Sequence, residues 1–159
     1  MPHTVIYSGF LDTATEGRKI HYVFVEANIS DPSNASLAIW LNGGPGCSSL
    51  NGMLREIGPY MVGDKYSQGD SLTKNDYSWT KVANVLFLES PAVVGFSTDT
   101  DSKYHWTDEE TARDAFHAVK DFIFKKADEF RNRSLYVLRQ PCRSPAKATQ
   151  ASTYLTWPT

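Results

Sequence analysis

The chain has 159 residues, of which 41% are hydrophobic and 21% are charged, and its formal net charge is −2. This length and composition are typical of a soluble globular protein with a sizeable core. The charge gives no basic field for nucleic acid, and no apolar run approaches the roughly 20 residues that span a membrane, so neither partner is expected.

The first half of the chain contains three segments with the composition of β-strands. Residues 4–11 and 19–26 are rich in β-branched and aromatic residues and predict a β-hairpin. A polar loop is predicted at residues 28–36. Residues 37–41 form a continuous apolar run, typical of a strand buried on both faces, and the glycine-rich segment 42–46 ends it.

A second buried strand is predicted at residues 82–88, followed by Glu89-Ser90-Pro91. One long helix is predicted from Thr107 to about Phe130, because Thr107 as N-cap and Glu110 three positions later form a capping box. A further strand begins at residues 134–137. The order of these elements predicts an α/β sheet protein. The apolar face of the helix is predicted to contain Ala112, Ala115, Phe116, Val119, Phe122 and Ile123.

The character of the sequence changes at Leu138. Residues 138–159 show neither the helical nor the strand period. The chain therefore divides into residues 1–137, which are predicted to belong to the α/β domain, and residues 138–159, which are predicted to be a tail outside it.

The segment from Trp40 to Ser49, which contains Gly43, Gly44 and Gly46, is the strongest chemical signal. A glycine-rich turn after a buried strand lets backbone N–H groups approach a ligand, either a phosphate or an oxyanion. The Gly-Lys-Ser/Thr of a phosphate-binding loop is absent, and the spacing does not fit a dinucleotide-binding turn. An oxyanion hole is the favoured interpretation, and a plain tight turn is the alternative.

The segment from Trp40 to Ser49 resembles the signature of the serine carboxypeptidases. The resemblance extends over roughly residues 5–137 and implies an α/β-hydrolase fold, present here only in part: the N-terminal hairpin, the first parallel strands and one long helix. Four other segments resemble the family in the same order: Tyr7-Ser8-Gly9-Phe10-Leu11, Glu56-Ile57-Gly58-Pro59, Asn75-Asp76-Tyr77-Ser78-Trp79, and Glu89-Ser90-Pro91-Ala92-Val93-Val94-Gly95-Phe96-Ser97.

The resemblance implies a serine-type carboxypeptidase, which releases C-terminal residues of peptides and proteins through an acyl-enzyme, with no metal and no cofactor. It implies that Asn42 and the Gly43 N–H bind the substrate's terminal carboxylate, supported by Glu56. The Gly44 N–H is then expected to stabilise the oxyanion, and Trp40 to shape the pocket. Without the motif context, Glu56 would be interpreted as a solvated loop residue.

The sequence departs from the family pattern at two positions near the site. Val93 stands where glycine is usual, which bears on the local turn geometry, and Thr98 stands where an aromatic residue is common. The resemblance also implies that Cys47 pairs with a cysteine of the family's second half. The other cysteine of this chain, Cys142, lies in the tail, so Cys47 is expected to be unpaired.

The catalytic nucleophile is missing from its expected place. After a strand like residues 134–137 the family has Thr-Gly-Glu-Ser-Tyr-Ala-Gly, and this motif is absent. Ser144 and Ser152 lack that context, and Asp114 and His117 on the long helix are interpreted as surface residues. The family is enzymatic, but this chain shows no Ser, Asp and His triad and is expected to be inactive as written.

The genetic code suggests a reason. Residues 145–154 can be encoded by nucleotides that, in an adjacent reading frame, spell Gly-Glu-Ser-Tyr-Ala-Gly-Ile-Tyr-Val. This is the nucleophile motif of the family. The hypothesis is that extra nucleotides, not a multiple of three in number, entered after Tyr136 through a wrong splice acceptor and shifted the frame.

Localisation and two alternative functions remain open. The family works in secreted, vacuolar or lysosomal space, yet no signal peptide is visible in this chain. Three sequons, at Asn28, Asn34 and Asn132, are candidate glycosylation sites. The alternatives to a carboxypeptidase are a non-catalytic splice or gene-model fragment that still binds peptide carboxylates, and a carboxypeptidase-like acyltransferase or lyase.

Overall fold

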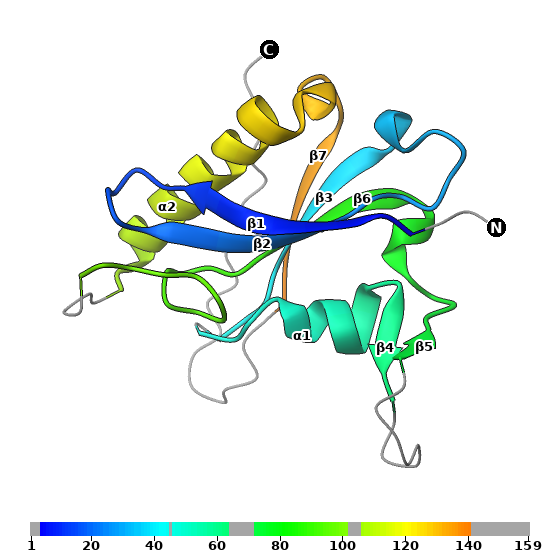
Figure 1. The fold of residues 1–159 in the computed structure, drawn as a ribbon, viewed down its shortest axis with the longest axis horizontal. Coiled ribbons are helices and arrows are strands. Elements are labelled where there is room, and N and C mark those ends of the chain that lie inside the picture. The colour runs from blue at the N-terminus through cyan, green and yellow to red at the C-terminus, as the bar shows by residue number, and fades with distance from the viewer. Residues whose placement is uncertain (1–3, 45, 64–71, 102–105, 141–159) are drawn as a thin grey trace.

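The computed structural model describes residues 4–44, 46–63, 72–101 and 106–140. Its centre is a mixed five-stranded sheet of order β1-β2-β6-β3-β7 (Figure 1). β1 pairs antiparallel with β2, β2 pairs antiparallel with β6, and β3 is parallel to both β6 and β7. The strands are β1 (Ile6–Asp12), β2 (Lys19–Val25), β3 (Ser36–Leu41), β6 (Ala83–Leu88) and β7 (Leu135–Arg139).

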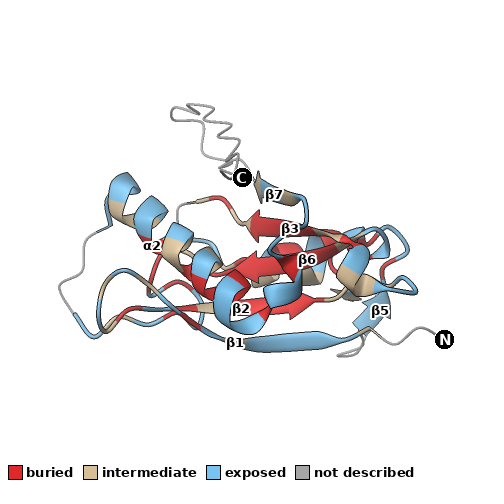
Figure 2. Ribbon diagram, turned by 90° about the horizontal axis from the view of Figure 1, so that it is seen from above, coloured by how far each residue is buried: buried red, intermediate tan, exposed pale blue. Residues whose placement is uncertain are grey.

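The central strands alternate their side chains between two apolar layers. Leu37 and Ile39 of β3 face a cluster that includes Phe122, beyond helix α2 (Asp108–Asp121). Ala38 and Trp40 face a second cluster with Ile57, after α1 (Leu50–Gly52). Because both faces are covered, β2, β6 and β3 are buried while β1 and β7 are exposed at the edges (Figure 2). Each fully buried Leu or Phe side chain contributes about 1.5–3 kcal/mol.

Short elements connect the strands. α1 continues directly as a π-helical segment, η2, and β4 and β5 form a separate antiparallel pair. The predicted polar loop contains the 3₁₀ turn η1, in which Asp31 accepts a hydrogen bond from the Ser33 N–H at 3.1 Å. The bounds are η1 (Pro32–Asn34), η2 (Met53–Ile57), β4 (Tyr60–Val62), β5 (Leu72–Lys74), η3 (Trp79–Lys81), η4 (Phe122–Lys126) and η5 (Asp128–Phe130).

The long helix begins where predicted, but its buried face differs from the prediction. The Thr107 side chain accepts a hydrogen bond from the Glu110 N–H at 3.2 Å, which confirms the N-cap. After α2 the chain continues through the π-helical η4 and the 3₁₀ turn η5. Phe116 is 42% exposed, whereas Ala118 is fully buried. Asp114 lies on the buried face and its carboxylate pairs with Arg18, an ionic contact that apolar spacing alone does not reveal.

β7 continues two residues past Val137, where the sequence predicts the end of the α/β domain. Leu138 pairs with Trp40, and Arg139 pairs with Leu41, in the same parallel register as the rest of the strand. Backbone pairing of this kind needs no side-chain period, so the sequence pattern could not locate its end.

No helix in the described parts of the chain is both long and apolar enough to cross a membrane.

Candidate active site

The glycine-rich turn follows β3 at the end of the parallel strands. Gly44 has φ +147° and Gly46 has φ +106°, values that side-chain-bearing residues rarely adopt. A Cβ atom on Gly44 would also lie 2.7 Å from the backbone nitrogen of Gly46. The glycines are therefore required by the path of the backbone.

Ser49 holds the two ends of this turn together. Its hydroxyl accepts a hydrogen bond from the Asn42 N–H at 3.1 Å and donates one to the Leu88 carbonyl at 2.6 Å. Ser49 is only 1% exposed. The turn is thus fixed against the end of β6, which limits its movement when a ligand approaches.

Glu89 directly follows β6, and its buried carboxylate contacts Ser48, next to the glycine-rich turn. Its side chain accepts hydrogen bonds from the Ser48 hydroxyl and from the Phe96 N–H at 2.8 Å, and pairs with His21 Nδ1 at 2.9 Å. Glu89 is fully buried. The sequence places Glu89 in a motif but does not indicate this role; a carboxylate directly after a buried strand is the available signal.

The N–H groups of Gly43 and Gly44 are available to a ligand. No described residue accepts a hydrogen bond from either of them. Gly43 is buried and Gly44 is half-buried, so both N–H groups lie in a partly desolvated place. Adjacent fixed donors of this kind can stabilise a negatively charged oxygen, which is the chemistry of an oxyanion hole.

The side chains proposed from the sequence around this turn are joined in one hydrogen-bonded chain. Trp40 Nε1–H donates to Asn42 Oδ1 at 2.7 Å, and Asn42 Nδ2 donates to Gln140 Oε1 at 2.8 Å. Gln140 Nε2 then donates to Glu56 Oε1 at 2.8 Å. The structure therefore brings Trp40, Asn42 and Glu56 together.

Gln140 lies in the segment that the sequence predicts to be a tail, so the sequence does not indicate its part in this network. Trp40, at 7% exposure, is buried and packs edge-on against Trp79, with ring centroids 5.6 Å apart. In this position Trp40 orients Asn42 through its indole N–H.

No group of three or more His, Cys, Asp or Glu side chains suited to a metal occurs among the described residues.

The structure corrects one interpretation on the long helix. Asp114 is not a surface residue: it is 1% exposed, and its carboxylate accepts a hydrogen bond from Arg18 at 3.1 Å. Arg18 is itself 7% exposed and also pairs with Asp99 at 2.6 Å. Asp114 therefore joins α2 to the turn between β1 and β2.

His117 is half-buried and lines a surface cavity with Asp12 and Lys125. Hydrogen bonds from Lys19 and Lys125 lower the pKa of the Asp12 carboxyl.

Cys47 is exposed and has a free thiol. The other candidates, Ser144, Ser152 and Cys142, lie outside the described residues.

The two departures from the family pattern have different structural consequences. Val93 has φ +65°, the left-handed conformation that glycine adopts without strain and that a β-branched residue rarely adopts. The family's preference for glycine therefore has a backbone reason. Thr98 pairs with Lys19 through two backbone hydrogen bonds of 2.9 Å, which do not depend on its side chain.

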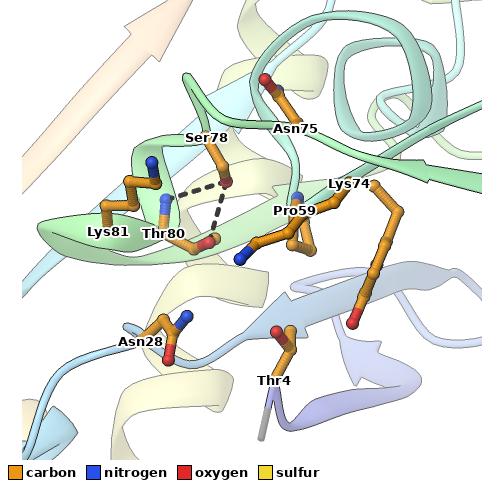
Figure 3. A pocket seen from close by; sticks show the side chains of 9 residues that line it. Thr4, Asn28, Pro59, Lys74, Asn75, Ser78, Thr80 and Lys81 are labelled. Atoms are coloured by element: carbon orange, nitrogen blue, oxygen red, sulfur yellow. Dashed lines mark hydrogen bonds between the residues drawn. The ribbon is translucent and has the colours of Figure 1, made fainter. Parts of the chain in front are cut away.

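The three sequons lie in different environments. Asn28 lines a small cavity of about 20 Å³ with Lys74, Ser78 and Thr80 (Figure 3), and its side-chain oxygen is buried without a partner among the described residues. The amide of Asn34 is engaged with Asp31 and with Arg133, whose Nη2 donates at 2.6 Å.

The third sequon asparagine, Asn132, is exposed in the turn before β7. Its environment thus differs from the partly enclosed side chain of Asn28 and the hydrogen-bonded amide of Asn34.

Comparison with known proteins gives the family. Residues 2–140 match the family described as serine carboxypeptidase, and this chain belongs to that family. The chain is 44% identical over 131 residues to the lysosomal protective protein of Mus musculus, covering 82% of this chain and 26% of the relative. It is 42% identical to a serine carboxypeptidase of Caenorhabditis elegans, with 82% of this chain and 27% of the relative covered.

A third relative has a different printed activity. The P-(S)-hydroxymandelonitrile lyase of Sorghum bicolor is 39% identical over 135 residues, with 83% of this chain and 26% of the relative covered. The chain thus spans about a quarter of the length of the relatives it matches. Members of the family are α/β-hydrolases, in agreement with the mixed sheet and its flanking helices.

Proposed function

We propose that this chain carries the carboxylate-binding and oxyanion-stabilising parts of a serine-type carboxypeptidase that acts on peptide and protein C-termini. Asn42 and the Gly43 N–H bind the terminal carboxylate, with Glu56 in support, and the Gly44 N–H receives the oxyanion. The observation that carries the proposal is the fixed turn with two adjacent N–H groups that no described residue engages.

The proposed chemistry follows from the position of these donors. When a nucleophile attacks the last peptide bond, negative charge develops on the carbonyl oxygen, and the Gly44 N–H meets it without rearrangement. One such donor contributes about 3–4 kcal/mol to the transition state in comparable sites. Asn42 and Gly43 hold the nearby carboxylate, which places the last peptide bond, and no other bond, beside Gly44. No cofactor is required for this acyl transfer.

We also propose that residues 1–137 are the N-terminal part of the hydrolase domain and that residues 138–159 are read in a shifted frame. β7 supports an incomplete sheet, because Tyr136 and Val137 are 55% and 37% exposed on a parallel strand at the edge of the described sheet. Parallel strands are usually covered on both faces. With no nucleophile motif after β7, we propose that residues 1–159 do not form an acyl-enzyme on their own.

A second function rests on the relative named as a lyase. An oxyanion hole serves hydrolysis, acyl transfer and other reactions through a charged oxygen, so the described site suits an acyltransferase or a lyase as well. A non-catalytic fragment that still binds peptide carboxylates would use the same donors. Product analysis with a protein that contains the nucleophile separates the enzymatic functions.

The relatives support a proposal on localisation. Relatives such as the lysosomal protective protein suggest a lysosomal or secreted family, and we place this chain in the same compartments. Of the three sequons, Asn132 is the preferred glycosylation site, because it is exposed, whereas Asn28 is partly enclosed and the Asn34 amide is hydrogen-bonded.

Binding of hippurate tests the carboxylate site directly. The chain is expected to bind hippurate at least about tenfold more tightly than hippuramide, which has the same size but no charge. Ligand-observed NMR measures both affinities at low protein concentration. Asn42→Ala is expected to remove the preference, and Asn132→Ala, a substitution at an exposed turn, is expected to retain it. Equal affinity for acid and amide would contradict the proposal.

A further inference from the structure

Trp106 places an exposed aromatic ring beside the glycine-rich turn. It directly precedes Thr107, the N-cap of α2, and is 42% exposed. A Cβ atom on Gly46 would lie 3.6 Å from Cη2 and 3.7 Å from Cζ3 of Trp106, which is ordinary van der Waals contact. The outer edge of the indole ring therefore lies over Gly46 and forms a wall at the end of the turn, two residues after Gly44.

The packing of α2 does not require an aromatic ring at position 106. In a hydrophobic staple, the residue before the N-cap packs against an apolar fourth residue of the helix, but the fourth residue of α2 is Thr111. Trp106 also belongs to neither apolar cluster of the core. An exposed ring beside fixed polar donors is typical of a ligand-binding surface.

The glycine-rich turn lies between Trp106 and the part of the site that holds the carboxylate. Trp106 leads into α2, which packs on one face of the sheet, whereas Glu56 lies in η2, which packs on the other face (Figure 1). A ligand whose carboxylate is held by the Gly43 N–H, and whose neighbouring carbonyl oxygen lies at Gly44, therefore directs its acyl group away from Glu56 and toward Trp106.

We infer that Trp106 is a specificity-determining residue, which contacts an apolar or aromatic side chain on the acyl side of the last peptide bond. The inference rests on the proposed function. An indole ring packs against another ring in offset or edge-on geometry, and the removal of both surfaces from water favours the contact. A small or charged penultimate side chain gains neither contribution. The site then selects a substrate both by its terminal carboxylate and by the apolar surface of the residue before it.

Hippurate and N-acetylglycine test this inference, because they share the glycine carboxylate and the amide and differ in a phenyl ring or a methyl group. The chain is expected to bind hippurate about tenfold more tightly than N-acetylglycine. Trp106→Ala is expected to reduce this ratio to about twofold and to keep the preference for hippurate over hippuramide. Trp106→Phe is expected to retain most of the ratio, because it retains a ring. Ligand-observed NMR measures each affinity.

The matched control is Phe116→Ala, which is expected to bind all three ligands as the unmodified chain does. Phe116 is also 42% exposed and lies about two turns further along α2. A second readout needs no alanine variant. The chain has four tryptophans, and after labelling with fluorotryptophan the fluorine resonance that Trp106→Phe removes belongs to Trp106. This resonance is expected to shift with hippurate and to move little with N-acetylglycine.

The possible failures are distinguishable. If Trp106→Ala keeps the full preference for hippurate over N-acetylglycine, or if the Trp106 resonance responds equally to both ligands, the inference is wrong and the proposed function stands. If the unmodified chain does not prefer hippurate to hippuramide, the proposed function fails, and this inference fails with it. The fluorine resonance decides the matter even if Trp106→Ala fails to fold.

Discussion

Arg18→Ala is expected to lower the free energy of unfolding by about 3–5 kcal/mol, or to abolish folding. Arg18 lies between the buried carboxylates of Asp99 and Asp114, at 2.6 Å and 3.1 Å. Removal of the guanidinium leaves both negative charges in an interior where the side chains of Asp99 and Asp114 are 2% and 1% exposed. The loss is large because the charges become unpaired, and it reflects this cost more than the net contribution of the native ion pairs. Urea denaturation followed by tryptophan fluorescence measures it.

Two controls show whether the effect comes from this network. Arg18→Lys keeps the charge but cannot reproduce the fork of donors, so an intermediate loss is expected. Lys125→Ala removes a cation that is 61% exposed and pairs with Asp12 and Asp121, and because the cation lies in solvent it is expected to lower the free energy of unfolding by no more than about 1 kcal/mol. A similar small effect for Arg18→Ala and Lys125→Ala would contradict the structural account of α2.

Glu89→Ala is expected to lower the free energy of unfolding by about 3 kcal/mol and to weaken hippurate binding as well. The buried carboxylate holds Ser48, His21 and the Phe96 N–H, and its removal leaves the Phe96 N–H unpaired. Because Ser48 lies next to the glycine-rich turn, its release affects the donors of Gly43 and Gly44. Urea denaturation and the hippurate titration measure the two effects on the same sample.

The matched control is Glu89→Gln, which retains the size of the side chain and one accepting oxygen. The hydroxyl of Ser48 and the ring of His21 can each accept as well as donate, so Gln can satisfy most of these contacts. We expect a loss of about 1 kcal/mol and near-normal hippurate binding. If Glu89→Ala itself leaves hippurate affinity unchanged, Glu89 supports the fold but does not position the turn.

Much of the fold was predictable because the central strands are continuous apolar runs ended by distinctive turns. The hairpin, β3, β6 and the start of α2 at Thr107 are all confirmed. The buried face of α2 was predicted less well, because Asp114 lies on it and Phe116 does not. A buried charged residue interrupts the apolar period, and its partner Arg18 is too distant in sequence for any local pattern to reveal.

The residues of the candidate site were likewise predictable only where a local sequence pattern contains them. One motif was enough to propose the residues that lie close together along the chain, which are Trp40, Asn42, Gly43 and Gly44. Gln140 and Glu89 join the site only through the pairing of β3 with β7 and β6, which brings together segments far apart in sequence. Gln140 was harder still, since it follows the point at which side-chain periodicity ends while backbone pairing continues.

The most direct test of the account is the sequence of the transcript and of the genomic DNA across codons 134 to 154. We expect transcripts without the extra nucleotides after Tyr136, in which the strand leads into Gly-Glu-Ser-Tyr-Ala-Gly and the gene encodes an active serine carboxypeptidase. If every transcript carries them, the shifted frame is genuine and the nucleophile motif is not translated after β7. Genomic DNA with no nucleophile motif open in the adjacent frame would contradict the account.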